Sequence, residues 1–548
     1  MPTKQGGDVS EQGTGKLGAG GPGCLSRREV LQRAGAGALM LAGGGLLEAC
    51  GSGSQAGTAT ANADQSKDFY GGSPQRGGTL RHGVSGGGPS DTLDAHKGAS
   101  AMDFARTTAL YETLWYSDVH FKLQPWLAQE AEHNAAGDVW TVRLRDGVKF
   151  HDGKPLSADD VIYSFKRILD PATASPQSGG LTMIDPQGMS KLDRLTVRFK
   201  LTTSFAPFPE ALSVGGYIVP VGYDPNKPVG TGPFEFKSFT PGQASLFTAF
   251  SEYWRPGHPY AAAINHLDFA DETSRINALI TDELDLADDF EFSLLKVVEA
   301  HSNVHVMVSP TDTIYAFGMR TDRAPFNDVR VRQAFRLIAD RPALVEGVFG
   351  GYGRIANDLY SPQDPDYDSS LPQRRQDIEQ AKALLKQAGH EGLTVPLTTG
   401  DLSAGIVAAS ELFSLQAKRA GVTVTLDKLE PSAFYGANQL SYQFAPILTG
   451  LYSYLLMAQQ LDGPTSSQNS THYADPEFDS LWRQGIKEFD QAKRRTIVTR
   501  MQEIQYTRGS LLIYAFNDVL DGYGKVGGMV PDVGGIAAYR YGDLWVTS

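Results

Sequence analysis

The chain has 548 residues, 41% hydrophobic and 20% charged, with 60 Gly and 30 Pro, a composition that excludes a disordered or fibrous protein. Its formal net charge of -13 argues against a nucleic-acid binder, because such proteins need a concentrated basic face to neutralise phosphates. At roughly 150 residues per domain the length predicts about three compact units, and no short repeat period indicates a solenoid.

The first 49 residues are typical of an export signal. Ser26-Arg27-Arg28 begins a twin-arginine pattern, and a Gly/Ala/Leu run from 34 to 47, too short to span a bilayer comfortably, follows it. Leu47-Glu48-Ala49-Cys50 then resembles the lipobox of bacterial lipoproteins, with an unusual Glu in its middle. We expect residues 1–49 to be a twin-arginine-like lipoprotein signal peptide that is removed, leaving a lipidated Cys50. The alternative is a poorly cleaved signal or a short membrane anchor.

Residues 50–75 are predicted to form the lipidated cysteine and a flexible tether. The stretch is rich in Gly, Ser, Ala and Thr, and a coil of that length reaches roughly 25 to 30 Å. The chain has two cysteines, and Cys24 lies in the part that would be removed, so neither a disulfide nor a cysteine metal site is expected. Acylation with two or more chains gives stable anchoring, so the folded body is expected near the outer membrane face.

A Gly-rich segment opens the folded body. Gly83-Val84-Ser85-Gly86-Gly87 matches the G-x-S-x-G pattern of serine hydrolases and follows a possible strand at 79–82. In those enzymes a helix starts directly after the Ser, whereas Gly86-Gly87-Gly88-Pro89 is a poor helix start. We therefore interpret the segment as a loop whose backbone approaches a ligand, and a secreted serine hydrolase using Ser85 stays as the alternative.

The stretch from 140 to 170 predicts a strand, a turn and a helix. Residues 140–145 alternate apolar and polar side chains, as a half-buried strand does. Ser157-Ala158-Asp159-Asp160 is a helix capping signature, and an apolar stripe continues until Pro171 stops the helix. His151 and Asp152 lie in the turn, where such a pair is more often hydrogen-bonded scaffold than an acid-base pair.

Later segments continue the alternation of strands and helices. Residues 195–201 read as a strand, 328–339 as a helix, and the acidic run 282–289 as a solvated turn after a short helix at 276–280. A helix, a Gly and a strand then follow one another twice, first at 378–388 with 393–397 and then at 411–420 with 422–426. This order predicts an α/β fold with a mixed or parallel sheet covered by helices. No zinc, phosphate-loop or calcium-loop motif is present, so we expect no metal and no cofactor.

Six strings, read together, resemble the extracellular solute-binding proteins of family 5, the dipeptide, oligopeptide and nickel class that serves ABC importers. The resemblance covers about residue 75 to the C-terminus, and its most specific block is 144–167. The strings are "ALYETLW" at 109–115, "LRDGVKFHDGKPLSADDVIYSFKR" at 144–167, "VGTGPFEFKSF" at 229–239, "APFNDVRVRQAFRLIADRPALVEGVFGG" at 324–351, "AKALLKQAGH" at 381–390 and "YADPEFDSLW" at 473–482.

The resemblance implies a two-lobed periplasmic-binding-protein type II clamshell. Lobe I would comprise residues 76–308, with an extra subdomain at about 101–190, and lobe II residues 309–510; residues 511–548 would return to lobe I. The chain would cross between lobes near 309–314 and again near 511–517. We expect a non-enzymatic, monomeric protein that captures a peptide-like or other polar solute by hinge closure and delivers it to ABC permease subunits. A clamshell sensor without an importer is a further alternative.

The resemblance also points to ligand contacts. In peptide-binding relatives, a segment resembling 442–456 carries an acid that pairs with the ligand's α-amine, but residues 448–456 contain no Asp or Glu. Either Asp94 or Asp462 replaces that acid, or the solute is a sugar, an aromatic compound or a blocked peptide, which tyrosine rings and hydroxyls suit. The expected ligand-binding residues are Ser85 and Gly86 in lobe I, Asn357 and Tyr360 after "GGYG", and Tyr452 and Tyr454, whose alternative role is packing.

Overall fold

The computed structural model of the chain describes residues 72–120, 122–403, 405–435, 438–450, 453–464, 466, 468–531 and 539–547. The predicted signal peptide, Cys50, most of the tether and Tyr452 lie outside these residues. Residues 63–548 belong to one compact unit, and the described part contains no helix long and apolar enough to cross a membrane. We keep the predicted limits of lobe I and lobe II as names for the two parts of this unit.

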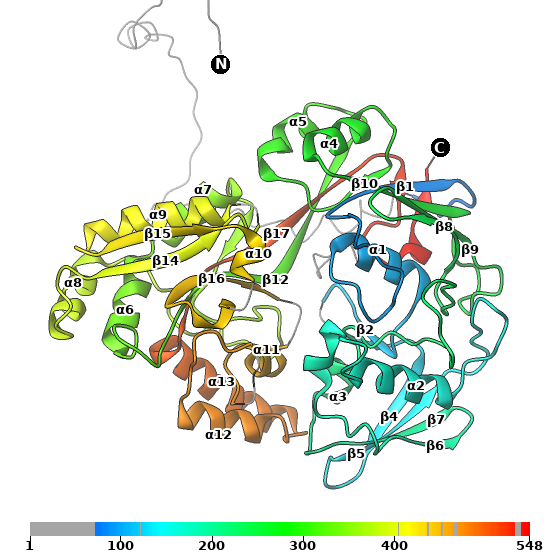
Figure 1. Cartoon of the computed structure of the whole chain (residues 1–548), viewed down its shortest axis with the longest axis horizontal. Coiled ribbons are helices and arrows are strands. Elements are labelled where there is room, and N and C mark those ends of the chain that lie inside the picture. Colours follow the sequence, from blue (N-terminus) through cyan, green and yellow to red (C-terminus); the bar gives the residue numbers. More distant parts are fainter. Residues whose placement is uncertain are drawn as a thin grey trace, which may run out of the picture. The chain divides into compact units, whose positions relative to one another are not determined.

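Two long strands connect the parts. β12 (His305–Met319) pairs antiparallel with β17 (Leu511–Tyr523), and the two predicted crossings, 309–314 and 511–517, lie within them (Figure 1). They belong to a nine-stranded sheet in the order β16-β12-β17-β11-β1-β10-β9-β8, with β13 paired to β17 as well. The other strands are β1 (Thr79–Ser85), β8 (Phe234–Thr240), β9 (Ala244–Ala249), β10 (Ala263–Phe269), β11 (Leu286–Ala287), β13 (Gly353–Ile355) and β16 (Phe444–Thr449).

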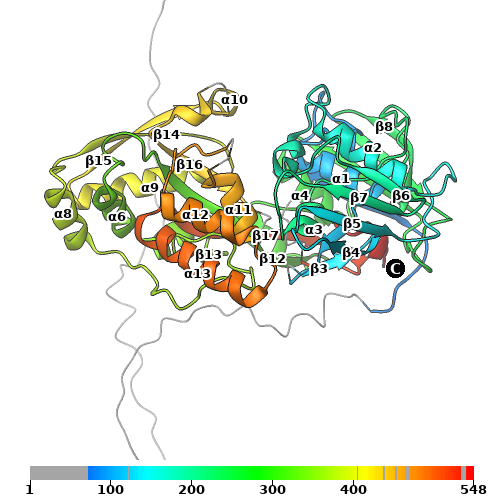
Figure 2. The ribbon, with the colours of Figure 1, turned by 90° about the horizontal axis from the view of Figure 1, so that it is seen from below.

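Lobe I adds a separate four-stranded sheet in the order β4-β5-β7-β6. Helix α2 (Ala158–Leu169) covers this sheet (Figure 2), and the Phe165 and Phe199 rings meet edge to face with centroids 5.5 Å apart. The strands are β4 (Ala128–His133), β5 (Val139–Leu144), β6 (Ser190–Asp193) and β7 (Thr196–Lys200), and the remaining lobe I elements are α1 (Ala101–Leu110), β2 (Trp115–Ser117), β3 (Leu123–Pro125), α3 (Phe208–Ala211), α4 (Glu272–Ile280), α5 (Leu295–Glu299), β18 (Val526–Gly527) and β19 (Trp545–Val546).

The turn before α2 is scaffold, as the sequence predicts. The backbone N–H of Gly230 donates to His151 Nδ1 at 3.1 Å, so Nε2 carries the proton that it donates to the Gly232 carbonyl at 3.0 Å. Burial lowers the pKa of His151 to about 4, which keeps the ring neutral. Asp152 pairs with Lys154 at 2.8 Å instead of with the ring. Both side chains are therefore occupied by contacts that hold the turn.

Lobe II confirms the repeated helix-Gly-strand order. β14 (Thr394–Gly400) and β15 (Thr423–Leu429) run parallel, each after a helix that ends near a glycine with positive φ, Gly389 and Gly421. The second helix starts earlier than predicted, at Ile406. The lobe II helices are α6 (Val329–Ile338), α7 (Arg341–Phe349), α8 (Ile378–Gln387), α9 (Ile406–Arg419), α10 (Pro431–Phe434), α11 (Tyr454–Leu461), α12 (Pro476–Gly485) and α13 (Gln491–Arg508).

The acidic run at 282–289 is not the solvated turn that the sequence predicts. Asp285 and Asp288 are buried, and the run contains β11, which joins the central sheet. Asp285 pairs with Arg81 at 2.6 Å, and Asp288 pairs with Arg275 at 3.0 Å. The prediction was wrong because Arg81, 204 residues before Asp285, and Arg275, on the preceding helix α4, neutralise these carboxylates, and local charge density alone does not show such partners.

A buried carboxylate ties helices α6 and α7 to β17. Asp358 is fully buried and accepts from Arg341 at 2.6 Å, from Arg374 at 2.7 Å and from the backbone N–H of Ile513 at 3.1 Å. Burial opposes its ionisation, but Arg341, Arg336 and Arg374 together hold the pKa of Asp358 below its usual value. The network therefore fixes the helices of lobe II against a strand that crosses between the lobes.

Asp358→Asn should destabilise the protein by about 3 to 5 kcal/mol, because it leaves the guanidinium of Arg341 buried without its counter-charge. Asn tolerates the positive φ of position 358, so backbone strain does not confuse the result. Urea unfolding measures the effect. The matched control is Asp146→Asn, which removes an exposed pair with Arg194 and should leave the stability unchanged. Equal effects of the two substitutions would contradict the network's role.

Candidate functional site

The two crossing strands are irregular where they pass between the lobes. The pairing of β12 with β17 is regular up to Pro310↔Asp518 and resumes at Ile314↔Phe516. Residues 311–313 of β12 therefore face the single residue Asn517. Such a bulge leaves extra residues out of the ladder and re-aims their side chains. Arg354 on β13 lies beside it and donates from Nε to Asp518 at 3.1 Å.

The segment that follows β16 packs against this bulge. A Cβ on Gly450 would lie 2.6 Å from the Cα of Thr313, so only glycine allows the close approach. Ser453 donates to the Glu210 carboxylate of lobe I at 2.8 Å, and the backbone N–H of Tyr454 donates to Asp364 at 2.7 Å. The segment that the resemblance implicates in ligand binding thus borders the crossing strands and also contacts lobe I.

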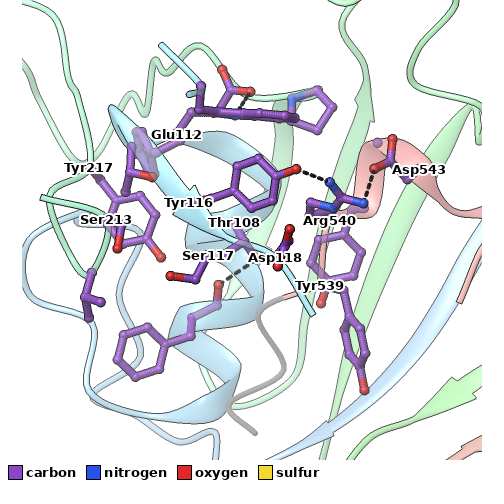
Figure 3. A pocket seen from close by; sticks show the side chains of 18 of the residues that line it. Thr108, Glu112, Tyr116, Ser117, Asp118, Ser213, Tyr217, Tyr539, Arg540 and Asp543 are labelled. Carbon is purple, nitrogen blue, oxygen red and sulfur yellow. Dashed lines mark hydrogen bonds and ion pairs between the residues drawn. The ribbon is translucent and has the colours of Figure 1, made fainter. Parts of the chain in front are cut away.

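Lobe I contains a cavity of about 630 Å³, a volume in the range of ligand pockets. It lies among α1, the β2–β3 hairpin, the loop after α3 and the C-terminal segment. Figure 3 shows Ser213 and Tyr217 on one side, Tyr539 and Arg540 on the other, and Thr108, Ser117 and Asp118 between them. Ser213 follows Glu210 by three residues, so the rim of the cavity lies close in sequence to the contact with Ser453.

Polar side chains, held by hydrogen bonds and ion pairs, lie among the aromatic side chains of the cavity wall. Arg540 donates to the Tyr116 hydroxyl at 2.8 Å, and its guanidinium lies 5.1 Å from the centre of that ring (Figure 3). Asp543 pairs with Arg540 at 3.2 Å and with Arg255 at 2.7 Å. Asp118 accepts from the backbone N–H groups of His120 and Lys122. The cavity therefore offers aromatic faces together with cationic and anionic groups whose positions are already set.

One wall carboxylate has an unusual environment. Glu112 accepts from the indole nitrogen of Trp126 at 2.8 Å, from the Tyr253 hydroxyl at 2.7 Å and from Trp254 at 3.0 Å. Burial raises the pKa of Glu112 to about 7, even though these hydrogen bonds favour the ionised form. Its charge therefore changes near neutral pH, beside a tryptophan that lines the cavity.

The residues predicted from the glycine-rich loop lie at the end of a central strand. Ser85 is the last residue of β1, which runs parallel to β10, and Gly86 follows with φ +81°. The Gly87 N–H donates to Asp268 at 3.1 Å, and the next helix, α1, begins only at Ala101. The strand-to-helix turn of a serine hydrolase is therefore absent after Ser85. A ligand contact from Ser85 and Gly86 stays a prediction.

The predicted lobe II residues occupy packed positions. Asn357 uses its amide to hold the backbone of Leu371, Pro372 and Arg374 at 2.8 to 3.2 Å. Tyr360 and Tyr454 are buried, and their rings stack with centroids 4.8 Å apart. The Tyr454 hydroxyl donates to Gln505 at 3.0 Å. The structure therefore brings Tyr360 and Tyr454 together. Tyr454 is packed in the core, which was the alternative role given for it in the sequence analysis.

None of the predicted ligand-binding residues that the structure describes lines this cavity, and its wall residues, among them Tyr116, Arg540 and Asp543, had no place in the sequence prediction. Tyr116 follows the "ALYETLW" string directly, but nothing in its local pattern separates a cavity tyrosine from a core one. Arg540 and Asp543 lie more than 400 residues later in the chain. A charge pair in a tyrosine-rich stretch was the available signal, and only the fold shows which surface it faces.

Comparison with solved structures identifies the class of fold. A structure described as the periplasmic binding protein AgaA from A. tumefaciens R10, in complex with agropinic acid, matches with a TM-score of 0.74 and 24% identity over 86% of this chain and 99% of that one. The substrate-binding protein CtaP of Listeria monocytogenes matches with a TM-score of 0.76 and 22% identity over 86% of this chain and 100% of that one. The fold is the two-lobed clamshell of type II periplasmic binding proteins.

Sequence comparison identifies the family. The family model described as "Bacterial extracellular solute-binding proteins, family 5 Middle" matches residues 122–471, and the chain belongs to this family. The glutathione-binding protein GsiB of Pectobacterium atrosepticum is 25% identical over 75% of this chain and 84% of its own. The periplasmic oligopeptide-binding protein OppA of Salmonella typhimurium is 27% identical over 76% and 83%. The family resemblance predicted from the sequence is confirmed.

Glu112 provides a test of the cavity wall. In the wild-type protein, tryptophan emission should change with a midpoint near pH 7, because the carboxylate gains charge beside the Trp126 indole. Glu112→Gln should abolish this transition, since the amide does not titrate. Emission spectra between pH 5.5 and 8.5 check this. Glu130→Gln, at an exposed carboxylate of β4, serves as control and should leave the transition unchanged; a transition that persists in Glu112→Gln would contradict the assignment.

Proposed function

We propose that this chain is the extracytoplasmic, lipid-anchored solute-binding component of an ABC importer, which captures a peptide-like or other polar solute and delivers it to a permease. The observation that carries the proposal is the pair of strands β12 and β17, shared by the lobes and bordered by a segment that contacts both. A solute that contacts both lobes favours the closed state by its differential affinity for that state.

Contacts between the lobes outside the crossing strands support this mechanism. Ser453 bonds Glu210, and the Ala206 N–H donates to the Ile486 carbonyl at 2.6 Å. The Phe489 ring of lobe II stacks on His133 of lobe I with centroids 3.9 Å apart. Residues of both lobes also share one buried apolar cluster. A ligand of micromolar affinity, worth about 8 kcal/mol, would add its own contacts to these in the closed state.

The cavity wall supports a peptide-like or other polar solute. Aromatic faces from Tyr116, Trp126 and Tyr217 suit apolar or sugar surfaces, while Arg540 suits a carboxylate. Relatives are described as binding glutathione, oligopeptides and agropinic acid, so the same fold accommodates different polar solutes. We place the solute between this cavity and the crossing strands, with Ser85, Gly86, Gly450 and Ser453 at its edges.

The location rests on the N-terminal sequence. The twin-arginine pattern, the apolar run and the lipobox-like Leu47-Glu48-Ala49-Cys50 support export followed by acylation of Cys50. The following Gly/Ser/Ala/Thr-rich tether allows the binding body to reach a permease in the same membrane. We propose that the mature protein begins at Cys50 and works as a monomer.

Ligand-dependent thermal unfolding tests the binding function. A true ligand should raise the apparent stability by about 2.7 kcal/mol at a hundredfold excess over Kd, because it binds the native state alone. The panel comprises free and N-acetylated di- to pentapeptides, oligosaccharides and nickel chelates. Arg540→Ala should weaken the affinity for the ligand at least tenfold and so reduce the thermal shift. Arg143→Ala, which removes an exposed pair with Glu130, should change neither. Absence of a shift with every member would contradict the proposal.

Acylation is tested by substituting its acceptor. In a bacterial host that processes lipoproteins, the wild-type protein should fractionate with membranes and carry the mass of an acylated N-terminal cysteine. Cys50→Ala should leave the protein without the lipid and move it from the membrane to the soluble fraction, because the other cysteine, Cys24, lies in the predicted signal. Cys24→Ala is the matched control. Membrane retention of Cys50→Ala would indicate an uncleaved hydrophobic anchor instead.

A further inference from the structure

Acidic side chains from both lobes meet where lobe I contacts the start of α11. The Ser453 hydroxyl of lobe II donates to the Glu210 carboxylate of lobe I at 2.8 Å (α11 and α3 in Figure 1). Ser453 is the N-cap of α11, and the next N–H, that of Tyr454, donates to the Asp364 carboxylate at 2.7 Å. Asp364 also acts on the Asp312 carboxylate of β12. A carboxylate of lobe I and one of lobe II are thus bonded to adjacent residues at the start of one helix.

The cations at this contact bind a third carboxylate. The Asp366 N–H donates to the Asp364 carboxylate at 2.7 Å, so the two acids of lobe II are neighbours. Arg494 and Arg495 of α13 donate to the Asp366 carboxylate at 3.5 and 3.2 Å. Arg494 attracts Glu210 as well, but its ion pair is with Asp366. In the described part of the chain, Glu210 therefore faces lobe II with a hydroxyl donor and without a paired cation.

The balance of these charges disfavours the ionised form of Glu210. Burial raises its pKa, and the Asp364 and Asp366 carboxylates raise it further. The Ser453 hydrogen bond and the Arg494 charge act in the opposite direction, yet the pKa of Glu210 stays above its usual value. Burial raises the pKa of Asp364 too, and the charge of Asp366 adds to that rise. The interface is thus short of positive charge when Glu210 is ionised.

Glu210 is the member of this acidic group that belongs to lobe I. A movement that separates the lobes takes it away from Asp364 and Asp366 and returns it to water, where its pKa has the usual value. Asp364, Asp366 and the two arginines stay together, because all of them belong to lobe II. His133 of lobe I also lies at the interface, but it stacks on the neutral Phe489 ring. The pKa of Glu210 is therefore higher with the lobes in contact than with the lobes apart.

We propose that Glu210 makes the contact between the lobes pH-dependent, so that its protonation favours the closed state and its ionisation favours opening and release of the solute. The proposal rests on the proposed solute-binding function and specifies how that function is regulated. Closing takes up a proton, because the state with the higher carboxyl pKa binds the proton more tightly. Closure is therefore most favourable below the usual pKa of glutamate. It becomes less favourable as the pH rises through the raised pKa of Glu210 and changes no further above it.

The distance between two spin labels tests closure without any solute. The labels are attached to Leu192→Cys of lobe I and Lys487→Cys of lobe II, both at exposed positions, in the full chain carrying Cys24→Ala and Cys50→Ala. The ratio of closed to open molecules should rise at least about threefold from pH 8 to pH 4.5, since one unit of pKa corresponds to a tenfold change in an equilibrium. Glu210→Gln should keep the lobes closed at both pH values, because the amide oxygen still accepts a hydrogen bond and carries no charge.

Two further variants separate this contact from a general effect of acidic groups. Ser453→Ala removes the donor that stabilises ionised Glu210 in the closed state, so it should make closure depend more strongly on pH. Asp462→Asn is the matched control. Asp462 is buried and burial raises its pKa to about 6, but its hydroxyl partner Ser510 lies in the same lobe. This variant should keep the pH dependence of the wild-type protein.

The outcomes separate this proposal from the binding function. A label distance that does not change with pH in the wild type, or a full pH dependence in Glu210→Gln, would overturn the proposal and leave the solute-binding function standing. If Glu210→Gln does not fold, an unchanged or weaker pH dependence in Ser453→Ala overturns it instead. A panel solute that binds the wild-type protein equally well at pH 4.5 and pH 8 would refute the coupling to release. If no panel solute binds while the distance follows pH through Glu210, the solute-binding function fails and the pH-dependent contact stands.

Discussion

Pairing between β12 and β17 extends from His305↔Tyr523 to Gly318↔Leu511, through both lobes, and it is interrupted where the chain passes between them. A continuous antiparallel ladder resists bending, because each backbone hydrogen bond fixes its neighbours. At the interruption, where residues 311–313 face Asn517, backbone dihedral angles can change without breaking the hydrogen bonds of the ladder on either side. The rest of the arrangement follows, since Gly450, Arg354 and Asp364 pack around the point that this pairing leaves irregular.

Two buried carboxylates that lie on or beside these strands have different environments. Asp358 contacts three arginines and the backbone of β17, so its charge is compensated and it holds α6 and α7 in place. Asp312, on β12, has one oxygen without a hydrogen-bond donor among the described residues although it is almost as buried. A compensated charge contributes to a rigid lobe, whereas an uncompensated one lowers stability unless a further group arrives. Asp358 therefore stabilises lobe II, whereas Asp312 does not stabilise the bulge between the lobes.

Local sequence patterns predicted the elements well and the buried charge pairs poorly. Alternation and capping located β5, α2, α6, α8 and the parallel pair β14–β15, because these signals act over a few residues. The prediction for the acidic run at 282–289 was wrong, since Arg81 and Arg275, which lie outside the run, neutralise two of its buried carboxylates. The cavity wall combines residues near 110, 215 and 540, and no periodicity shows that they meet. Pro310 and Asp312 within a strand were the local signs of the bulge, and they have meaning only once β17 is known to pair there.

The position of each solute contact matters for closure. A group bound at the crossing strands alone touches a part of the chain common to open and closed states, so it would shift the equilibrium between them little. The remaining atoms of the solute must therefore contact surfaces that come together on closure, and Glu210 with Ser453 marks one such place, next to the rim of the lobe I cavity. Contacts at such places, and not contacts at the crossing strands, supply the differential affinity that closes the lobes.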